Sequence, residues 1–146
     1  MTPRLAVALR WATLSLLVLV SACRSQSPEP DPANELPFGF LDDPTPGAQV
    51  QREFLVRGWA LDDGEIREIR IFVDGRFITR TSLNDDRPDV RAAHQRYAKG
   101  HDRHGWRITV VLQPSVTAGT HTILAQAVDD RGATRDIGSA QIALTR

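Results

Sequence analysis

Cysteine, methionine and tyrosine each occur only once among the 146 residues, and aromatic side chains make up 6% of the chain. A single cysteine excludes an internal disulfide and the paired-cysteine motifs of zinc and redox sites. The 18 Lys and Arg residues balance 18 Asp and Glu residues, which excludes a wholly basic nucleic-acid-binding protein. Motifs for nucleophilic hydrolysis and phosphate binding are also missing. We therefore expect a protein that is not an enzyme and needs no cofactor.

The first 23 residues have the order of a bacterial export signal. Arg4 and Arg10 precede an apolar run, residues 11–20, that is too short to cross a bilayer of about 30 Å as a helix. The four residues ending at Cys23, Val-Ser-Ala-Cys, resemble the lipobox of bacterial lipoproteins. This resemblance implies cleavage before Cys23, lipidation of its sulfur and acylation, as by palmitate, of the new amino group. The alternatives are an ordinary signal peptide and a buried core cysteine. Arg24 resembles the pattern of outer-membrane rather than inner-membrane lipoproteins.

The chain divides into three predicted parts: a signal peptide over 1–22, a lipidated cysteine with a tether over 23–36, and a folded domain over 37–146. Residues 24–36 contain three prolines, two serines and no aromatic residue. Such a stretch buries too little apolar area to offset its ordering entropy, so we expect it to be extended. At about 3.1 Å per residue it reaches roughly 40 Å, which would keep the domain near a membrane.

From Pro37 onward, apolar residues recur with a period of two, which is typical of strands with one buried face. The clearest alternations lie at 54–61, 69–73, 108–112, 121–128 and 140–144. Turn-forming residues separate these runs, and Asp74-Gly75 is the clearest hairpin signal. About seven short strands at this spacing predict an all-β fold, an antiparallel β-sandwich.

Residues 82–105, called the crossover below, break this pattern because they are too long and too polar for a hairpin loop. Pro88 and Asp89 suit the first turn of a helix, and Asp86 suits its cap. Three residues then share one face at helical spacing: Val90, Ala93 and Tyr97. The crossover is therefore predicted to hold a short helix over 88–97, followed by a loop rich in Gly and His.

Several motifs together resemble one type of bacterial immunoglobulin-like domain. They are GWALDD (58–63), IREIRIFVDG (66–75), RPDVRAAHQRY (87–97), GW (105–106) and AGTHTILAQAVDDRG (118–132). That type has an Asp after its second strand, a V-D-G hairpin, an R-P-D-V helical crossover and a G-T-H-x-L strand. The resemblance covers nearly all of 38–146. It implies an immunoglobulin-like sandwich that serves exported or surface proteins as a non-catalytic module, often beside enzymes acting on carbohydrate.

A basic stretch, residues 87–107, is the first candidate interaction surface. It carries two aspartates against six basic residues: Arg87, Arg91, Arg96, Lys99, Arg103 and Arg107. A local positive surface can meet anionic lipid headgroups or an acidic partner. The alternative is a solvated loop in which Arg87 pairs with Asp89 to hold the crossover on the sandwich.

Two aromatic residues, Trp59 and Phe72, fall on the outward phase of their strands. An exposed aromatic ring beside apolar side chains can stack on a sugar ring or anchor a partner. The alternative is that the crossover helix covers one of these faces. Trp106 begins an inward-facing run and is predicted to lie in the core.

Four potential metal ligands, His94, His101, Asp102 and His104, lie within eleven residues. Their spacing matches no established metal site, so no metal is predicted. His121 starts an inward-facing strand, and its ring is expected to bond to nearby backbone. The acidic pairs all fall at turns, where carboxylates commonly cap backbone N–H groups: Asp42-Asp43, Asp62-Asp63, Asp85-Asp86 and Asp129-Asp130.

These features predict a lipid-anchored cell-envelope protein whose immunoglobulin-like domain is a non-catalytic protein-binding or assembly module. The alternative is a carbohydrate- or peptidoglycan-binding module that uses its exposed aromatic residues. The expected partners are the membrane, through the lipid anchor, and either a protein or an envelope glycan, but no nucleic acid. The candidate interaction surface comprises Trp59, Phe72, Arg87, Arg91, Arg96, Lys99 and Arg103.

Overall fold

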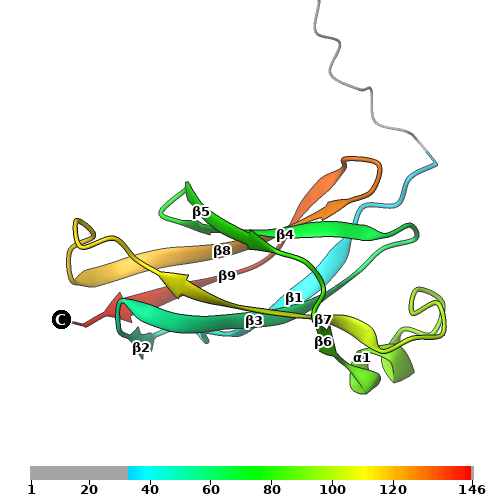
Figure 1. Ribbon diagram of the computed structural model, residues 1–146, viewed down its shortest axis with the longest axis horizontal. Coiled ribbons are helices and arrows are strands. Elements are labelled where there is room, and N and C mark those ends of the chain that lie inside the picture. The colour runs from blue at the N-terminus through cyan, green and yellow to red at the C-terminus, as the bar shows by residue number, and fades with distance from the viewer. Residues whose placement is uncertain (1–32, 146) are drawn as a thin grey trace, which may run out of the picture.

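Strands dominate the computed structural model, which describes residues 33–145 (Figure 1). The elements in chain order are β1 (Phe38–Asp43), β2 (Ala48–Val50), β3 (Glu53–Leu61), β4 (Ile66–Val73), β5 (Arg76–Thr81), β6 (Asp85–Asp86), α1 (Pro88–Ala93), β7 (Arg103–Val111), β8 (Gly119–Asp129) and β9 (Thr134–Leu144). The predicted signal peptide and Cys23 lie outside the described residues. Between residues 33 and 145, no helix is long and apolar enough to span a membrane.

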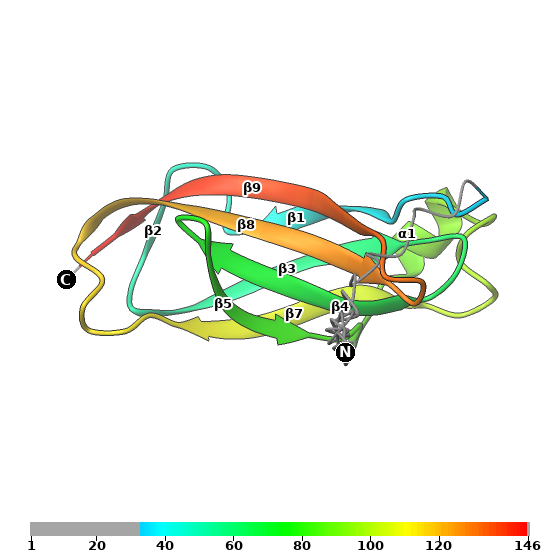
Figure 2. The same cartoon turned by 90° about the horizontal axis from the view of Figure 1, so that it is seen from above.

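The strands form two sheets packed face to face, and the fold is the predicted immunoglobulin-like β-sandwich. Sheet A has the strand order β1-β3-β7-β6, and sheet B has the order β2-β9-β8-β4-β5. The strand pairs are antiparallel except β2 with β9, which is parallel. α1 and β6 lie at one end of the sandwich, while β2 and the carboxyl end of the chain lie at the other (Figures 1 and 2).

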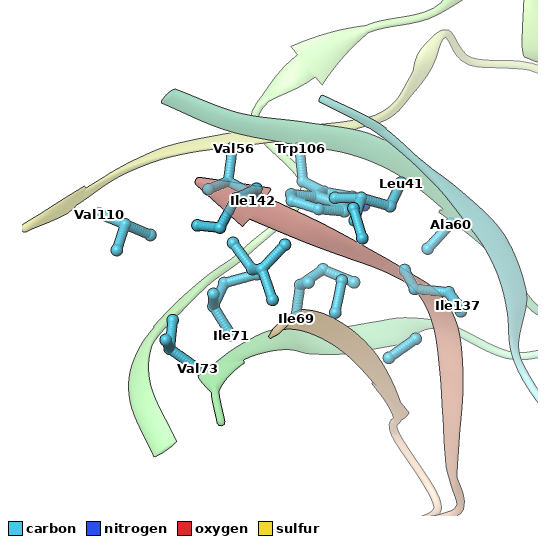
Figure 3. Packing of buried hydrophobic residues seen from close by; sticks show 14 of the residues in the cluster. Leu41, Val56, Ala60, Ile69, Ile71, Val73, Trp106, Val110, Ile137 and Ile142 are labelled. Atoms are coloured by element: carbon cyan, nitrogen blue, oxygen red, sulfur yellow. The ribbon is translucent and has the colours of Figure 1, made fainter. Parts of the chain in front are cut away.

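The core lies between the sheets and is centred on Trp106, which is fully buried, as predicted. Figure 3 shows its indole among Leu41, Val56 and Ile142. Gly58 lies opposite Trp106 in the β3–β7 register. A Cβ at Gly58 would come within 2.6 Å of the indole Cζ2 atom, so the glycine leaves the room that the large ring needs.

The helix of the crossover is shorter than predicted. α1 ends at Ala93, whereas the predicted helix extended to Tyr97. The chain turns after α1 and brings the Tyr97 ring to 4.8 Å from the Phe38 ring, so this packing replaces further helical turns. Asp86 was the predicted cap, but this was wrong: Asp86 belongs to β6, and Arg87 occupies the N-cap position without a side-chain cap bond.

Candidate functional site

The crossover covers one end of the outer face of sheet A. The Phe38 ring lies 4.8 Å from the Tyr97 ring, 5.5 Å from the His94 ring and 6.1 Å from the Trp59 ring. The His94 and Trp59 rings are 5.2 Å apart. Trp59 points outward as predicted, but it is half-buried because Phe38 and His94 lie against it. Trp59 therefore packs the crossover onto the sheet, and its contact with a ligand stays a prediction.

Each basic side chain of residues 87–107 lies beside a carboxylate. The pairs are Arg87 with Asp42 and Asp89, Arg91 with Asp102, Arg96 with Glu35, Lys99 with Glu65, Arg103 with Asp86, and Arg107 with Asp85. Most of these carboxylates come from outside the stretch. The positive charge counted along the sequence is therefore balanced in space, and recognition of an acidic partner by these residues stays a prediction.

Arg87 makes the most complete of these pairs and ties α1 to β1. Its Nη1 donates to Asp42 Oδ2 at 2.6 Å, while its Nε and Nη2 donate to Asp89 at 2.9 and 2.8 Å. The guanidinium lowers the pKa of Asp89 to about 2, mainly through these hydrogen bonds. Gly105 lies beneath Arg87, since a Cβ there would come within 2.7 Å of Arg87 Cγ. Arg87 thus pairs with Asp89, as in the alternative to a basic interaction surface.

The residues just before β1 are held at the same end of the sandwich. Asn34 donates from Nδ2 to Asp129 Oδ2 at 2.6 Å, and its Oδ1 accepts from Arg131 Nη1 at 2.6 Å. Glu35 accepts a hydrogen bond of 2.8 Å from the Tyr97 hydroxyl. These contacts begin within the stretch predicted as tether, so its last residues are attached to the domain surface.

Carboxylates of the β3–β4 and β8–β9 turns gather beside this segment. As expected for turn caps, Asp62 Oδ2 accepts the Gly64 N–H at 2.7 Å, and Asp129 Oδ1 accepts the Ala133 N–H at 2.7 Å. Asp62 is only 3% exposed. The pKa of Asp62 is raised to about 6, chiefly by burial; the charges of Asp63 and Asp129 also raise it, while the bond from the Gly64 N–H opposes the rise.

The histidines are engaged in packing and in hydrogen bonds. His104 is buried, its Nε2 lies 2.8 Å from the carbonyl oxygen of His101, and burial lowers its pKa. His121 Nδ1 lies 2.6 Å from Asp74 Oδ2, and its Nε2 lies 2.8 Å from the carbonyl oxygen of Thr117, as predicted for a ring bonded to backbone. The bond to Asp74 raises the pKa of His121. In the described part of the chain, no three His, Cys, Asp or Glu side chains are arranged to hold a metal ion.

Three large apolar side chains lie exposed on the outer face of sheet A beyond the crossover. Phe40 is 56% exposed, Leu55 49% and Val111 59%. We did not identify these residues from the sequence, although the period-two pattern contains the signal. Leu55 and Val111 each neighbour a buried residue, Val56 and Val110, and so must point outward.

The outer face of sheet B carries an aromatic pair beside a groove. Phe72 points outward as predicted, is half-buried, and meets the Phe77 ring edge-on at 5.8 Å. Phe77 is 54% exposed. The groove has a volume of about 530 Å³ and lies over β8 and β9. Phe72 thus belongs to a surface separate from that of Trp59.

No known protein family and no curated protein matches this sequence. Solved structures with a similar fold include fibronectin(III)-like modules of Clostridium thermocellum CbhA, with a TM-score of 0.48, 10% identity, and coverage of 73% of this chain and 93% of that chain. A Jonesia denitrificans lytic polysaccharide monooxygenase has a TM-score of 0.45 and 14% identity, over 70% of this chain and 60% of that chain. CopC from Methylosinus trichosporium OB3b has a TM-score of 0.38 and 14% identity, over 73% of this chain and 92% of that chain. At these identities the likeness extends to the fold alone.

Proposed function

We propose that the chain is a lipid-anchored protein of the cell envelope, at the outer membrane, whose immunoglobulin-like domain binds another protein without catalysing a reaction. The order of charged, apolar and small residues before Cys23 supports the anchor. The exposed apolar side chains on the outer face of sheet A carry the binding role. They suit a partner protein that presents an apolar patch of its own.

This face has the composition of a protein contact surface. Val111 lies opposite Glu53 in the β3–β7 register, two residues along β3 from Leu55, so Leu55 and Val111 are diagonal neighbours. Between them and Phe40, Arg57 is paired with Asp43. Aromatic, apolar and arginine side chains are enriched in the centres of protein interfaces, and large exposed apolar patches on soluble domains mark such contacts.

Changing Cys23 to serine should release the protein from the membrane fraction, because serine has no thiol to accept the lipid. The measurement is the distribution of the protein between membrane and soluble fractions after cell lysis. Changing Ser21 to alanine, which keeps Cys23, serves as the matched control and should leave the protein membrane-bound. Unchanged fractionation of the Cys23→Ser protein would remove the anchor from this proposal.

A photo-crosslinking residue at Leu55 or Val111 should give a discrete adduct with one envelope protein in living cells. The side chains at both positions point away from the core, so the replacement leaves the fold intact. Arg135, which is exposed on sheet B, is the control position and should not yield this adduct. The adduct should also disappear when the other apolar residue of the pair is changed to aspartate, since a charge opposes burial. Identical adducts from all three positions would contradict a specific contact at sheet A.

A further inference from the structure

The outer face of sheet B differs chemically from that of sheet A. Along β8 and β9, buried side chains alternate with outward side chains, and the outward ones form the floor of the groove. Four of these are exposed and polar but uncharged: Thr120, Thr122, Ser139 and Gln141. Thr122 lies directly opposite Gln141 in the β8–β9 register. The groove floor therefore offers three hydroxyl groups and one amide to a ligand.

One wall of the groove stands at the side of β9 with which β2 pairs, just before β2 begins. It is formed by Pro46 and Gly47, and the Gly47 N–H donates to the Gln141 carbonyl oxygen at 2.7 Å. This bond fixes the wall against the floor. The groove is thus part of the folded sandwich and does not depend on a ligand to form.

The aromatic pair continues the same face across the sheet. Leu124 lies two residues after Thr122 and is opposite Phe72, which in turn is opposite Phe77. Ser139 is opposite Leu124 on the other side. One row across four strands therefore runs from an exposed aromatic ring to a hydroxyl group, directly beside the groove.

Most charged side chains beside this face are already held in local bonds. Asp74 is bonded to His121 and to the Thr122 N–H, and Glu68 lies between Arg70 and Arg80. The side chains that line the groove are all uncharged. A ligand without charge matches such a surface, because a charged ligand would lose hydration and meet no opposite charge.

We propose that the groove, together with Phe72 and Phe77, binds an uncharged glycan chain. Hydroxyl and amide groups can both donate to and accept from sugar hydroxyls, while the C–H faces of sugar rings pack against aromatic and apolar side chains. An extended peptide fits less well. The floor of the groove is the face of the β8–β9 pair, whose facing backbone groups already bond to each other, so a peptide strand lying on it would not extend the sheet.

This glycan site goes beyond the proposed protein contact, because it uses the opposite sheet. It also places carbohydrate binding, the alternative function inferred from the sequence, on sheet B. Phe72 stays in the surface, whereas Trp59 lies under the crossover and is replaced by the more exposed Phe77.

The test uses the full-length protein, purified in detergent, against hexasaccharides of glucose, N-acetylglucosamine, mannose and galactose. Binding is measured by calorimetric titration, with an acidic hexasaccharide and an uncharged peptide as comparison probes. At least one uncharged hexasaccharide should bind. Phe77→Ala and Gln141→Ala should each weaken this binding about tenfold. Affinity should stay constant between about 0.05 M and about 0.5 M salt, since no charge takes part.

Val111→Ala is the matched control, because it also truncates an exposed apolar side chain but on sheet A. It should leave glycan binding unchanged. The inference is overturned if no uncharged hexasaccharide binds, if only the acidic hexasaccharide or the peptide binds, or if Phe77→Ala and Gln141→Ala bind as tightly as the unmodified protein. A negative glycan result with an intact crosslink from Leu55 would reject the glycan site and leave the protein contact standing.

Discussion

Replacing Trp106 with alanine should destabilise the domain by about 3–5 kcal/mol, the range typical of removing a buried aromatic side chain. Trp106 is 0% exposed and fills the space between the two sheets over Gly58. Because domains of this size are stable by only about 5–15 kcal/mol, this loss is a large share of the total free energy of unfolding. The measurement is the midpoint of unfolding in urea, followed by circular dichroism.

Trp106→Phe and Val111→Ala are the informative comparisons. The buried Nε1 of Trp106 has no hydrogen-bond partner in the described structure. Phenylalanine removes this unsatisfied donor and keeps an aromatic ring. Trp106→Phe should therefore lower the free energy of unfolding clearly less than Trp106→Ala does. Val111 is 59% exposed, and its truncation should change stability by less than about 0.5 kcal/mol. Equal losses of unfolding free energy for Trp106→Ala and Val111→Ala would contradict the central position of the indole in the core.

Changing Asp62 to asparagine should stabilise the domain at pH 7 by about 1–3 kcal/mol. In the folded protein the Asp62 pKa is raised from 3.8 to about 6, chiefly by burial. A carboxyl group with a raised pKa favours the folded state below its unfolded pKa, and this contribution is lost as the pH rises through about 6. Asparagine carries no charge at any pH, and its side-chain oxygen can still accept the Gly64 N–H.

The difference in unfolding free energy between Asp62→Asn and the unmodified protein should therefore shrink as the pH falls from 7 to about 4. Urea titrations at several pH values measure it. Asp130→Asn is the matched control, since Asp130 belongs to the neighbouring turn but is exposed. It should change stability by less than about 0.5 kcal/mol at each pH. A difference for Asp62→Asn that is constant across this range would rule out titration of Asp62 as its cause.

The two sheets were predictable because the long strands each show a clear period of two. β8 and β9 alternate buried and exposed residues over most of their eleven positions, which the sequence pattern also displays. β2 and β6 were missed because three and two residues are too few to establish a period. The parallel pairing of β2 with β9 depends on the path of the preceding loop, which local pattern does not encode.

The candidate site was harder to predict because the charge of the basic stretch and the exposure of Trp59 both depend on residues far away in the chain. The basic stretch has a positive net charge when only residues 87–107 are counted. Glu35, Asp42 and Glu65 approach it through the fold and balance it. Trp59 was correctly assigned to the outer face, but its cover includes Phe38, which lies twenty-one residues earlier in the chain.

The bonds of Asn34 and Glu35 decide at which end of the domain the chain from a lipid anchor would arrive. Because the side chains of both residues are bonded to the domain, this segment is held against the surface next to the start of β1. The attachment is at the α1 end of the sandwich, while β2 and the start of β8, which border the groove, lie at the opposite end (Figure 2). In a lipid-anchored protein the groove would therefore lie at the end of the domain remote from the anchor, beside whatever polymer fills the space beyond it.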